Sequence, residues 1–489
     1  MEIVILIIYA SAMLFIFLYS IVQIQLVYHY LKNKKRDEKI VDPPEMEHFP
    51  FVTFQLPIYN EKYVIERLIE SISVMDYPKD KFEIQVLDDS DDETSEIVSN
   101  LIKEKARLGL NIQHIQRSIR KGFKAGALAE GMTTAKGELI AIFDADFIPQ
   151  RDFLLNTIKH FEDKKLGMVQ AKWEHVNKNY SFLTQLQAFG LDAHFTVEQS
   201  GRNRGGHFIN FNGTAGIWRK SCIVDAGGWQ SDTLTEDLDL SYRAQLKGWK
   251  FKYLESCGAP AELPAHMNAL KTQQYRWTKG AAECTRKNLM SVLKSNNFPL
   301  NTKLNAIFHL LNSSLFICIV VTSILSIPVL YIKHYFPEYS LLYKLAGVFL
   351  IGVIFLSIFY FVAFASVEKK SKRMVPEFLI KFPLFLSVSM GLSLHNGIAA
   401  FEGLIGRTTP FVRTPKFNIQ DKNDSWHDNK YVTPKIGKLT YIEILLTCYF
   451  AYGLYLSIKL DDYGLFPFIL MLLLGYSYVA YLSIRHSMN

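Results

Sequence analysis

Long apolar segments alternate along this chain with one extended stretch of mixed polar and apolar residues. The largely apolar segments are residues 3–30, 304–332, 342–367, 376–405, 439–459 and 463–484. A helix needs about 20 apolar residues to cross the hydrocarbon core of a bilayer, and each of these segments reaches that length. Residues 45–300 have instead the composition of an aqueous domain. The pattern predicts a helical transmembrane region joined to one large soluble domain.

Basic residues beside the apolar segments indicate how the chain is oriented, because lysine and arginine gather on the cytoplasmic side of membrane spans. They follow the first segment as Lys32, Lys34, Lys35 and Arg36, and the third as Lys369, Lys370, Lys372 and Arg373. The first segment is also too long for the core of a signal peptide. We therefore expect residues 1–31 to be an N-terminal anchor and the large soluble domain of a multi-pass protein of the plasma (inner) membrane to be cytoplasmic.

Residues 376–405 fit a membrane span poorly, although they are long enough to cross. Pro383 and Gly391 interrupt the segment, and basic residues flank it on both sides, at Arg373 and Arg407. If the segment crossed, one basic flank would lie outside. We therefore prefer a re-entrant or interfacial pair of helices, which leaves the other apolar segments as true spans and places the C terminus inside. Whether this segment crosses stays open.

The mixed region, residues 45–285, alternates short β-rich runs with helical patterns. The β-rich runs are Phe51–Leu56, Glu83–Leu87 and Glu138–Phe143, and helical patterns at Glu61–Val74 and Glu93–Leu108 lie between them. This repetition predicts an α/β domain with a Rossmann-like, doubly wound and mostly parallel sheet. In such a sheet the ligand lies beyond the carboxyl ends of the strands. We expect the transmembrane and interfacial helices in residues 286–489.

Acidic residues follow the carboxyl ends of these predicted strands. Glu61 follows the first run, Asp88 and Asp89 follow the second, and Asp144 and Asp146 follow the third. Any one of them alone could be a helix cap, but their recurrence favours a shared ligand. In extended backbone, residues i and i+2 point the same way, so Asp144 and Asp146 can face one ion. Such carboxylates bind Mg²⁺ or Mn²⁺ together with substrate phosphates.

A second acidic cluster, Thr235-Glu236-Asp237, lies farther along the chain. Thr233 and Glu236 fit the capping-box pattern at the start of a helix, which gives Glu236 a structural task. Asp237 is then the better candidate for a general base, although both acids could instead stabilise the helix dipole. We expect Asp237 to be exposed and to have an ordinary pKa of about 4.

Aromatic residues supply a further clue. All but one of the six tryptophans lie between residues 173 and 277. Their rings pack well on the faces of pyranose sugars, yet clustered aromatic residues are more often plain core. The strongest exception is Gln273-Gln274-Tyr275-Arg276-Trp277, in which an arginine and amides adjoin the ring. Arg276 can pair with a pyrophosphate in a bidentate fashion.

Charge and cysteine content argue against other classes of protein. The net charge of +7 could favour nucleic acid, but the basic residues gather beside apolar segments. We therefore expect the lipid bilayer as a partner and no nucleic acid. The five cysteines have no metal-binding spacing. An odd, scattered set of this kind fits thiols that are kept reduced in the cytosol.

Together, these motifs resemble the family 2 glycosyltransferases with a GT-A fold, the membrane-embedded inverting synthases. The D, DxD, TED and QxxRW series of that family is matched in order by Asp88, by Asp144 and Asp146, by Thr235, Glu236 and Asp237, and by Gln273, Arg276 and Trp277. The resemblance covers residues 50–285 closely and the remainder of the chain more loosely.

The resemblance implies a role for each matched residue. The residues implied to bind the nucleotide sugar are Pro57, Tyr59, Glu61, Asp88, Lys124 and Asp144. Asp146 would bind the metal with Asp144 beside it. The catalytic set would be Asp237 as the base, Glu236 next to it, and Gln273, Arg276 and Trp277 over the diphosphate and acceptor. The residues implied to lie along the acceptor are Asn212, Gly213, Thr214 and Trp277.

Within the family, the chain is most similar to the cellulose synthase-like A type, the β-mannan and glucomannan synthases. The segment Phe411-Val412-Arg413-Thr414-Pro415-Lys416, within residues 406–420, resembles the gating loop F-x-V-T-x-K of cellulose synthases, with Arg413 in place of the expected valine. The resemblance implies an inverting, metal-dependent hexosyltransferase that takes UDP-glucose or GDP-mannose. It would extend a β-linked polysaccharide and couple synthesis to translocation of the glycan across the membrane.

Two other functions remain open. A lipid glycosyltransferase resembling ceramide glucosyltransferase would add one sugar and stop. A non-enzymatic membrane scaffold would keep only a decayed catalytic fold. The full set of acids argues against the scaffold. The pair Arg276-Trp277, together with the gating-like loop, favours polymer synthesis over single addition.

Overall fold

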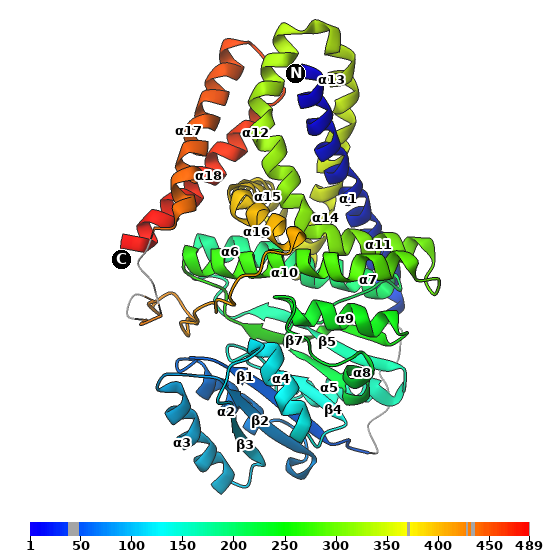
Figure 1. The fold of residues 1–489 in the computed structure, drawn as a ribbon, viewed down its shortest axis with the longest axis vertical. Coiled ribbons are helices and arrows are strands. Elements are labelled where there is room, and N and C mark those ends of the chain that lie inside the picture. Colours follow the sequence, from blue (N-terminus) through cyan, green and yellow to red (C-terminus); the bar gives the residue numbers. More distant parts are fainter. Residues whose placement is uncertain (38–47, 369–371, 427–428, 432–435, 489) are drawn as a thin grey trace.

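The computed structural model describes residues 1–37, 48–368, 372–426, 429–431 and 436–488. Figure 1 shows three layers along the long axis of the molecule: an α/β domain, a layer of helices that lie across it, and a bundle of long helices. The N terminus lies at the far end of the bundle, whereas the C-terminal end of the last helix lies on the side of the α/β domain.

The α/β domain is built on a seven-stranded sheet with the order β3-β2-β1-β4-β6-β5-β7. Its strands are β1 (Val52–Ile58), β2 (Phe82–Asp88), β3 (Ile112–Gln116), β4 (Leu139–Ile142), β5 (Leu166–His175), β6 (Gly216–Arg219) and β7 (Lys250–Ala261). Strand β6 is antiparallel to both of its neighbours, and the other pairs are parallel. The predicted doubly wound, mostly parallel sheet is confirmed.

Helices cover both faces of this sheet, because successive side chains of each strand point to opposite faces. In β4, Leu139 and Ala141 belong to one apolar core, and Ile140 and Ile142 belong to the other. The first core is completed by α2 (Ile65–Ser73), α3 (Thr94–Arg107) and α5 (Phe153–Ile158). The second is completed by α4 (Phe123–Thr134), α8 (Lys220–Asp225) and α9 (Glu236–Leu246).

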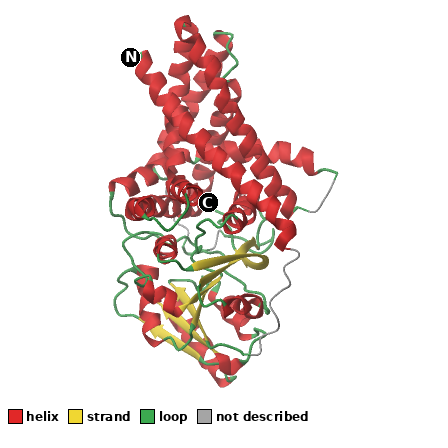
Figure 2. Ribbon diagram, turned by 90° about the vertical axis from the view of Figure 1, so that its right-hand side faces the viewer, coloured by secondary structure: helices red, strands yellow, loops and turns green. Residues whose placement is uncertain are grey.

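The middle layer consists of helices that lie across the long axis (Figures 1 and 2). It includes α6 (Phe182–Ala193), α7 (Gln199–Arg204), α10 (Met267–Lys294), α11 (Leu300–Leu310), α15 (Met374–Gly391) and α16 (Ser393–Ile405). Helix α10 is the long member, and it separates the carboxyl ends of the strands from the helical bundle. This layer therefore joins the α/β domain to the membrane region.

The bundle contains the long apolar helices α1 (Glu2–Asp37), α12 (Ser314–Tyr335), α14 (Leu350–Val367), α17 (Lys438–Lys459) and α18 (Phe466–Met488), with the short α13 (Ser340–Ala346) at its far end. Among the described residues, six helical segments are long and apolar enough to cross a membrane. The chain is a multi-pass membrane protein. The basic residues Lys369 and Lys370 lie outside the described residues.

Helix α15 is one of those six segments by length and composition, although we predicted that residues 376–405 lie in the interface. Figure 1 shows α15 end-on, whereas α12 and α14 run along the long axis. A crosswise helix of this kind suits an interfacial position, and the interfacial assignment stays a prediction. Two glycines let α15 pack closely on α18: a Cβ on Gly475 would lie 1.8 Å from the carbonyl oxygen of Ser387, and one on Gly391 would lie 2.3 Å from that of Gly475.

Candidate active site

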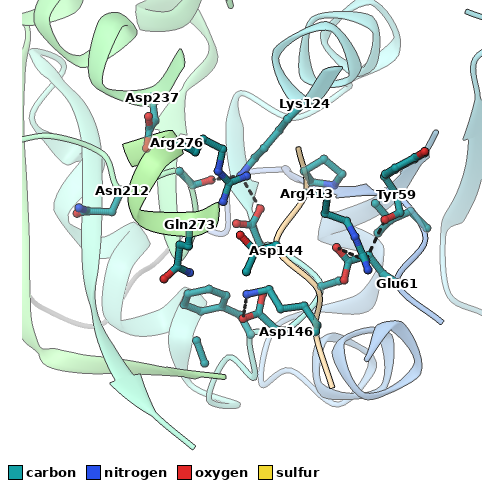
Figure 3. A pocket seen from close by; sticks show the side chains of 18 of the residues that line it. Tyr59, Glu61, Lys124, Asp144, Asp146, Asn212, Asp237, Gln273, Arg276 and Arg413 are labelled. Carbon is teal, nitrogen blue, oxygen red and sulfur yellow. Dashed lines mark hydrogen bonds and ion pairs between the residues drawn. The ribbon is translucent and has the colours of Figure 1, made fainter. Parts of the chain in front are cut away.

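A cavity of about 150 Å³ lies where the carboxyl ends of the strands face α10 and the loop around residue 413. Most of the predicted site residues line it (Figure 3): Pro57, Tyr59, Glu61, Lys124, Asp144, Asp146, Asn212, Gly213, Glu236, Asp237, Gln273, Arg276 and Trp277. Asp88 and Thr214 do not line it. In Figure 3, Tyr59 and Glu61 lie on one side of Asp144, and Asn212 and Asp237 lie on the other.

The carboxylates that follow β4 face this cavity, and each one has a lysine partner. Lys124 forms an ion pair with Asp144, and the Lys416 ammonium lies 2.6 Å from Oδ2 of Asp146. The backbone turns at Ala145 and Asp146, so the two side chains do not project from extended backbone as we predicted. Among the described residues, no group of three or more acidic, histidine or cysteine side chains gathers as a metal site. A divalent ion held by Asp144 and Asp146 would take its remaining ligands from a substrate or from water.

The predicted nucleotide side of the cavity is rich in arginine. The Arg120 guanidinium lies 3.4 Å from the centroid of the Tyr59 ring. Arg117 forms an ion pair with Asp89, which lines the cavity. Asp88 is buried instead, where it accepts hydrogen bonds from Ser95 and from the backbone N–H of Ser90 and contacts His114.

The adjacent acids Asp88 and Asp89 therefore have different environments. As the last residue of β2, Asp88 points into the domain, and its neighbour points into the cavity, because successive side chains alternate in direction. The sequence alone could not show which of the two adjacent aspartates faces the cavity.

Glu236 and Asp237 both line the cavity, from the start of α9. The predicted capping box is wrong, because the helix begins at Glu236, with Thr235 at the N-cap and no side-chain capping bond. The expected exposure of Asp237 is also wrong. Burial, followed by the charge of Glu236, raises the pKa of Asp237 to about 7, and burial also raises the pKa of Glu236.

Gly213 brings the backbone close to Asp237. Its φ of +80° lies in the left-handed region, and a Cβ there would lie 3.1 Å from Oδ2 of Asp237. The Lys124 ammonium donates a hydrogen bond to the carbonyl oxygen of Gly213 at 2.9 Å. Because Lys124 also pairs with Asp144, this one side chain links the two acidic parts of the site. The hydroxyl of Thr214 accepts a hydrogen bond from the backbone N–H of Asp144.

Helix α10 contributes Gln273, Arg276 and Trp277, whose spacing places them on one face of the helix. This helix packs closely on the acidic cluster, because a Cβ on Gly280 would lie 2.5 Å from Cγ2 of Thr235. Of the other tryptophans, Trp218 and Trp229 are buried in the core, whereas Trp173 lines the cavity. Trp218 and Trp229 are therefore ordinary core residues.

The gating-like loop enters the cavity through Phe411, Arg413, Thr414 and Lys416. Arg413 donates to the carbonyl oxygens of Tyr59 and Asn60, and its guanidinium lies 3.3 Å from Oε1 of Glu61. The substitution of arginine for valine thus adds an anchor to the end of β1.

Glu262 anchors the same loop, and it was not among the site residues that we predicted from the sequence. Its carboxylate accepts the backbone N–H groups of Phe417 and Asn418 at 2.9 and 2.8 Å, and burial raises its pKa to about 7. It directly follows β7, so an acid search at every strand end could have found it.

A second cavity, of about 370 Å³, lies in the membrane region and begins beside the first. The two cavities share Leu191, Gln273 and Trp277. Much of the second lining is apolar, but Gln23 of α1 and Asn396 of α16 contribute amides. Gln23 is 2% exposed, and neither polar atom of its amide has a hydrogen-bond partner among the described residues. An unpaired amide of this kind is available to a polar ligand.

Comparisons with known proteins agree with the geometry. Residues 50–280 match the family described as "Glycosyltransferase like family 2". A probable glucomannan 4-beta-mannosyltransferase 4 of Oryza sativa subsp. japonica is 44% identical over 58% of this chain and 52% of its own length, so the match spans about half of that relative. Glucomannan 4-beta-mannosyltransferase 9 of Arabidopsis thaliana is 36% identical over 82% of this chain and 74% of its own length.

A solved structure shares the fold. The mannosyltransferase PcManGT from Pyrobaculum calidifontis, determined in complex with GDP-Man and Mn²⁺, covers 83% of this chain and all of its own, with a TM-score of 0.54 and 19% sequence identity. The predicted GT-A fold of the catalytic domain is therefore confirmed.

Proposed function

The chain belongs to the family 2 glycosyltransferases, as its motifs predicted, and from this premise we propose that it is an inverting hexosyltransferase that extends a β-linked glycan of the mannan or glucan type. One observation carries the proposal. Asp144, Asp146, Asp237 and Arg276 line a single cavity, and this cavity adjoins a second one in the membrane region at Trp277.

The two carboxylates after β4 suit a hard divalent ion, Mg²⁺ or Mn²⁺, whose remaining ligands would be the phosphates of the donor. When bound, the ion would neutralise the charge that develops on the departing diphosphate. Lys124 and Lys416 partner these carboxylates, so a bound ion would share them with cationic side chains or displace those side chains. Arg276 would pair with the diphosphate through its fork of N–H donors.

Asp237 would accept the proton of the attacking acceptor hydroxyl. Direct displacement at the anomeric carbon inverts its configuration and needs a base but no protein nucleophile. A pKa near 7 suits this task, because a base works best when its pKa lies close to the working pH. The backbone at Gly213 lies close to this carboxylate, and Lys124 fixes that backbone through a hydrogen bond to the Gly213 carbonyl oxygen.

The relatives are named as mannosyltransferases and the PcManGT structure holds GDP-Man, so GDP-mannose is the favoured donor and UDP-glucose is the second candidate. On this proposal, Tyr59, Glu61, Asp89 and Arg120 surround the nucleotide. The catalytic domain would lie on the cytoplasmic side of the plasma (inner) membrane, because basic residues flank the spans on that side. The product would leave through the second cavity, whose buried amides can bind the hydroxyl groups of a glycan.

A donor screen tests the proposal. The purified protein in lipid nanodiscs would be given GDP-mannose or UDP-glucose, with Mn²⁺, with Mg²⁺ or with a chelator. We expect hydrolysis and transfer with one of the donors, loss of both with the chelator, and loss of both in Asp146→Asn, which removes one charged ligand without a change in size. Normal activity in Asp146→Asn would contradict the metal assignment, and inactivity toward both donors would contradict the function.

A further inference from the structure

One turn of π-helix, His194–Glu198, connects α6 to α7. It follows closely after Leu191, which lines both cavities. Such turns are rare and occur frequently at functional sites. His194 and Glu198 line the second cavity, and both lie outside the motifs of the family. A buried arginine fixes the end of this segment. Glu198 accepts a hydrogen bond from Arg202 at 2.9 Å, and Arg202 is only 1% exposed.

The hydrogen bonds of His194 determine which ring nitrogen carries the proton. Nδ1 lies 2.9 Å from Oε2 of Glu198, so Nδ1 must be the donor to this carboxylate. In the neutral ring Nε2 is then an acceptor, and it lies 3.3 Å from Nδ2 of Asn212. At its other end, the Asn212 amide accepts a hydrogen bond from Gln199 at 2.7 Å. His194 and Gln199 therefore fix the orientation of this amide from both sides.

Asn212 lines the active-site cavity, directly before Gly213 and its contact with Asp237. The backbone N–H of Asn212 donates to Gln170 at 2.9 Å, so the main chain is held as well as the side chain. With one N–H on His194, the second N–H of the Asn212 amide and the free lone pair of its oxygen remain for a ligand. Asn212 lies on the same side of Asp144 as Asp237, the proposed base (Figure 3).

We propose that His194, held by Glu198 and Arg202, is a positioning residue that orients Asn212 toward the hydroxyl groups of the glycan acceptor. This inference rests on the proposed function. The family resemblance already implies that Asn212 lies along the acceptor, and the new assignment is to His194, which keeps one edge of that amide directed toward the sugar. Tyr59 and Glu61, which belong to the proposed nucleotide side, lie on the other side of Asp144, so donor binding should not depend on His194.

The test separates acceptor binding from donor chemistry. In nanodiscs, hydrolysis of the donor by water and transfer to a soluble β-1,4-manno-oligosaccharide would be measured for wild type, His194→Ala and His194→Gln. We expect His194→Ala to raise the acceptor KM about three- to tenfold, the effect of one lost hydrogen bond, with the donor KM and hydrolysis unchanged. His194→Gln should recover most of the loss, because its carbonyl oxygen can accept from Asn212. His48→Ala, at an exposed histidine outside both cavities, is the control.

A double-mutant cycle then tests the route through Asn212. In an Asn212→Ala background, His194→Ala should raise the acceptor KM no further. An unchanged acceptor KM in His194→Ala, a parallel fall in hydrolysis and transfer, or additive effects in the cycle would each overturn the inference. If His194→Ala does not fold, His194→Gln in the same cycle decides between these results. If wild type itself transfers no sugar, the proposed function fails instead.

Discussion

At the scale of single residues, the charge of Asp237 controls the proposed chemistry. A carboxylic acid cannot accept a proton, so the base is active only above its pKa, which burial and Glu236 raise to about 7. We therefore expect kcat/KM for transfer to rise with pH between about 6 and 8 and then to level off. Asp237→Asn should lower transfer about 10²- to 10⁴-fold and remove this dependence, while donor binding stays nearly intact. Measured rates and donor affinities across this pH range check both points.

Glu236→Gln is the matched comparison for Asp237→Asn. Because the charge of Glu236 raises the pKa of Asp237, its removal should move the rising limb of the pH profile to lower pH. The variant should remain active at pH 8. If Glu236→Gln is inactive and Asp237→Asn is active, the base has been assigned to the wrong carboxylate.

Gly213 permits a second residue-scale prediction. Gly213→Ala would strain a left-handed backbone and would also place a methyl group 3.1 Å from the Asp237 carboxylate. Gly109→Ala imposes the same kind of strain, at a φ of +85°, but meets no atom within 4 Å. We expect both variants to lose about 1 kcal/mol of stability and only Gly213→Ala to lose transfer. Equal activity of the two variants would contradict the contact with the base.

The residues of the site could be predicted from sequence where chemistry and spacing coincide. Asp144, Asp146 and Asp237 were found because acids recur at strand ends and in the TED motif. The family motif assigned the first aspartate to Asp88, whereas Asp89 lines the cavity, because the sequence does not show which way a side chain points at the end of a strand. The burial of Asp237, which sets its pKa, depends on packing between segments far apart in the chain.

At the scale of elements, the gating-like loop contacts two acidic residues on different strand ends of the first cavity. Lys416 pairs with Asp146, and Arg413 contacts Glu61. On the proposed function, a metal ion would have to displace Lys416 from Asp146 before it could use that carboxylate fully. We therefore expect Lys416→Ala to lower the half-saturating Mn²⁺ concentration about tenfold, the effect of one charged hydrogen bond. Titration of donor hydrolysis with Mn²⁺ measures this change.

Lys422→Ala is the control for this prediction, because Lys422 lies in the same loop region and is exposed. Its half-saturating concentration should equal that of wild type. A weaker response to Mn²⁺ in Lys416→Ala would mean that the lysine supports the metal rather than competing with it.

The individual elements could largely be predicted, because apolar periodicity determines strands and helices locally. Strands β1, β2 and β4 begin and end within two residues of the predicted runs. The start of α9 was placed wrongly, because Thr233 and Glu236 match a capping pattern that the backbone does not adopt. The turn of π-helix at His194 has no sequence pattern that we could identify.

At the scale of the whole molecule, the arrangement of the layers makes a prediction about topology. We expect cysteines placed at Lys34, Arg413 and Arg485 to be unreactive toward an impermeant maleimide outside intact cells, because these positions lie on the side of the catalytic domain. Lys370, which falls outside the described residues, should behave in the same way. A cysteine at Glu338, exposed between α12 and α13, should react and is the control.

These labelling experiments need a background that lacks the exposed native Cys448. A reaction at Arg413 from outside would mean that residues 376–405 cross the membrane. The parity of the spans would then be different from the one we predict.

The sequence was sufficient to predict the architecture of separate membrane and α/β parts, because segment length and strand–helix alternation reflect the solvent around each part. The second cavity could not be predicted in this way. Gln23 and Asn396 lie within apolar segments, and only the packing of α1, α10 and α16 brings them to one space beside Trp277.

The central claim is that sugar is added repeatedly and that the product leaves through this second cavity. The size of the product tests it most directly. Radiolabelled GDP-mannose and, in parallel, UDP-glucose would be given to wild type and to Asp237→Asn in nanodiscs, and the products separated on a glycan gel. The account predicts a ladder or polymer with one donor in wild type, digestible by a β-glycan hydrolase, and none in Asp237→Asn. A single sugar attached to lipid, with no longer product, would contradict it.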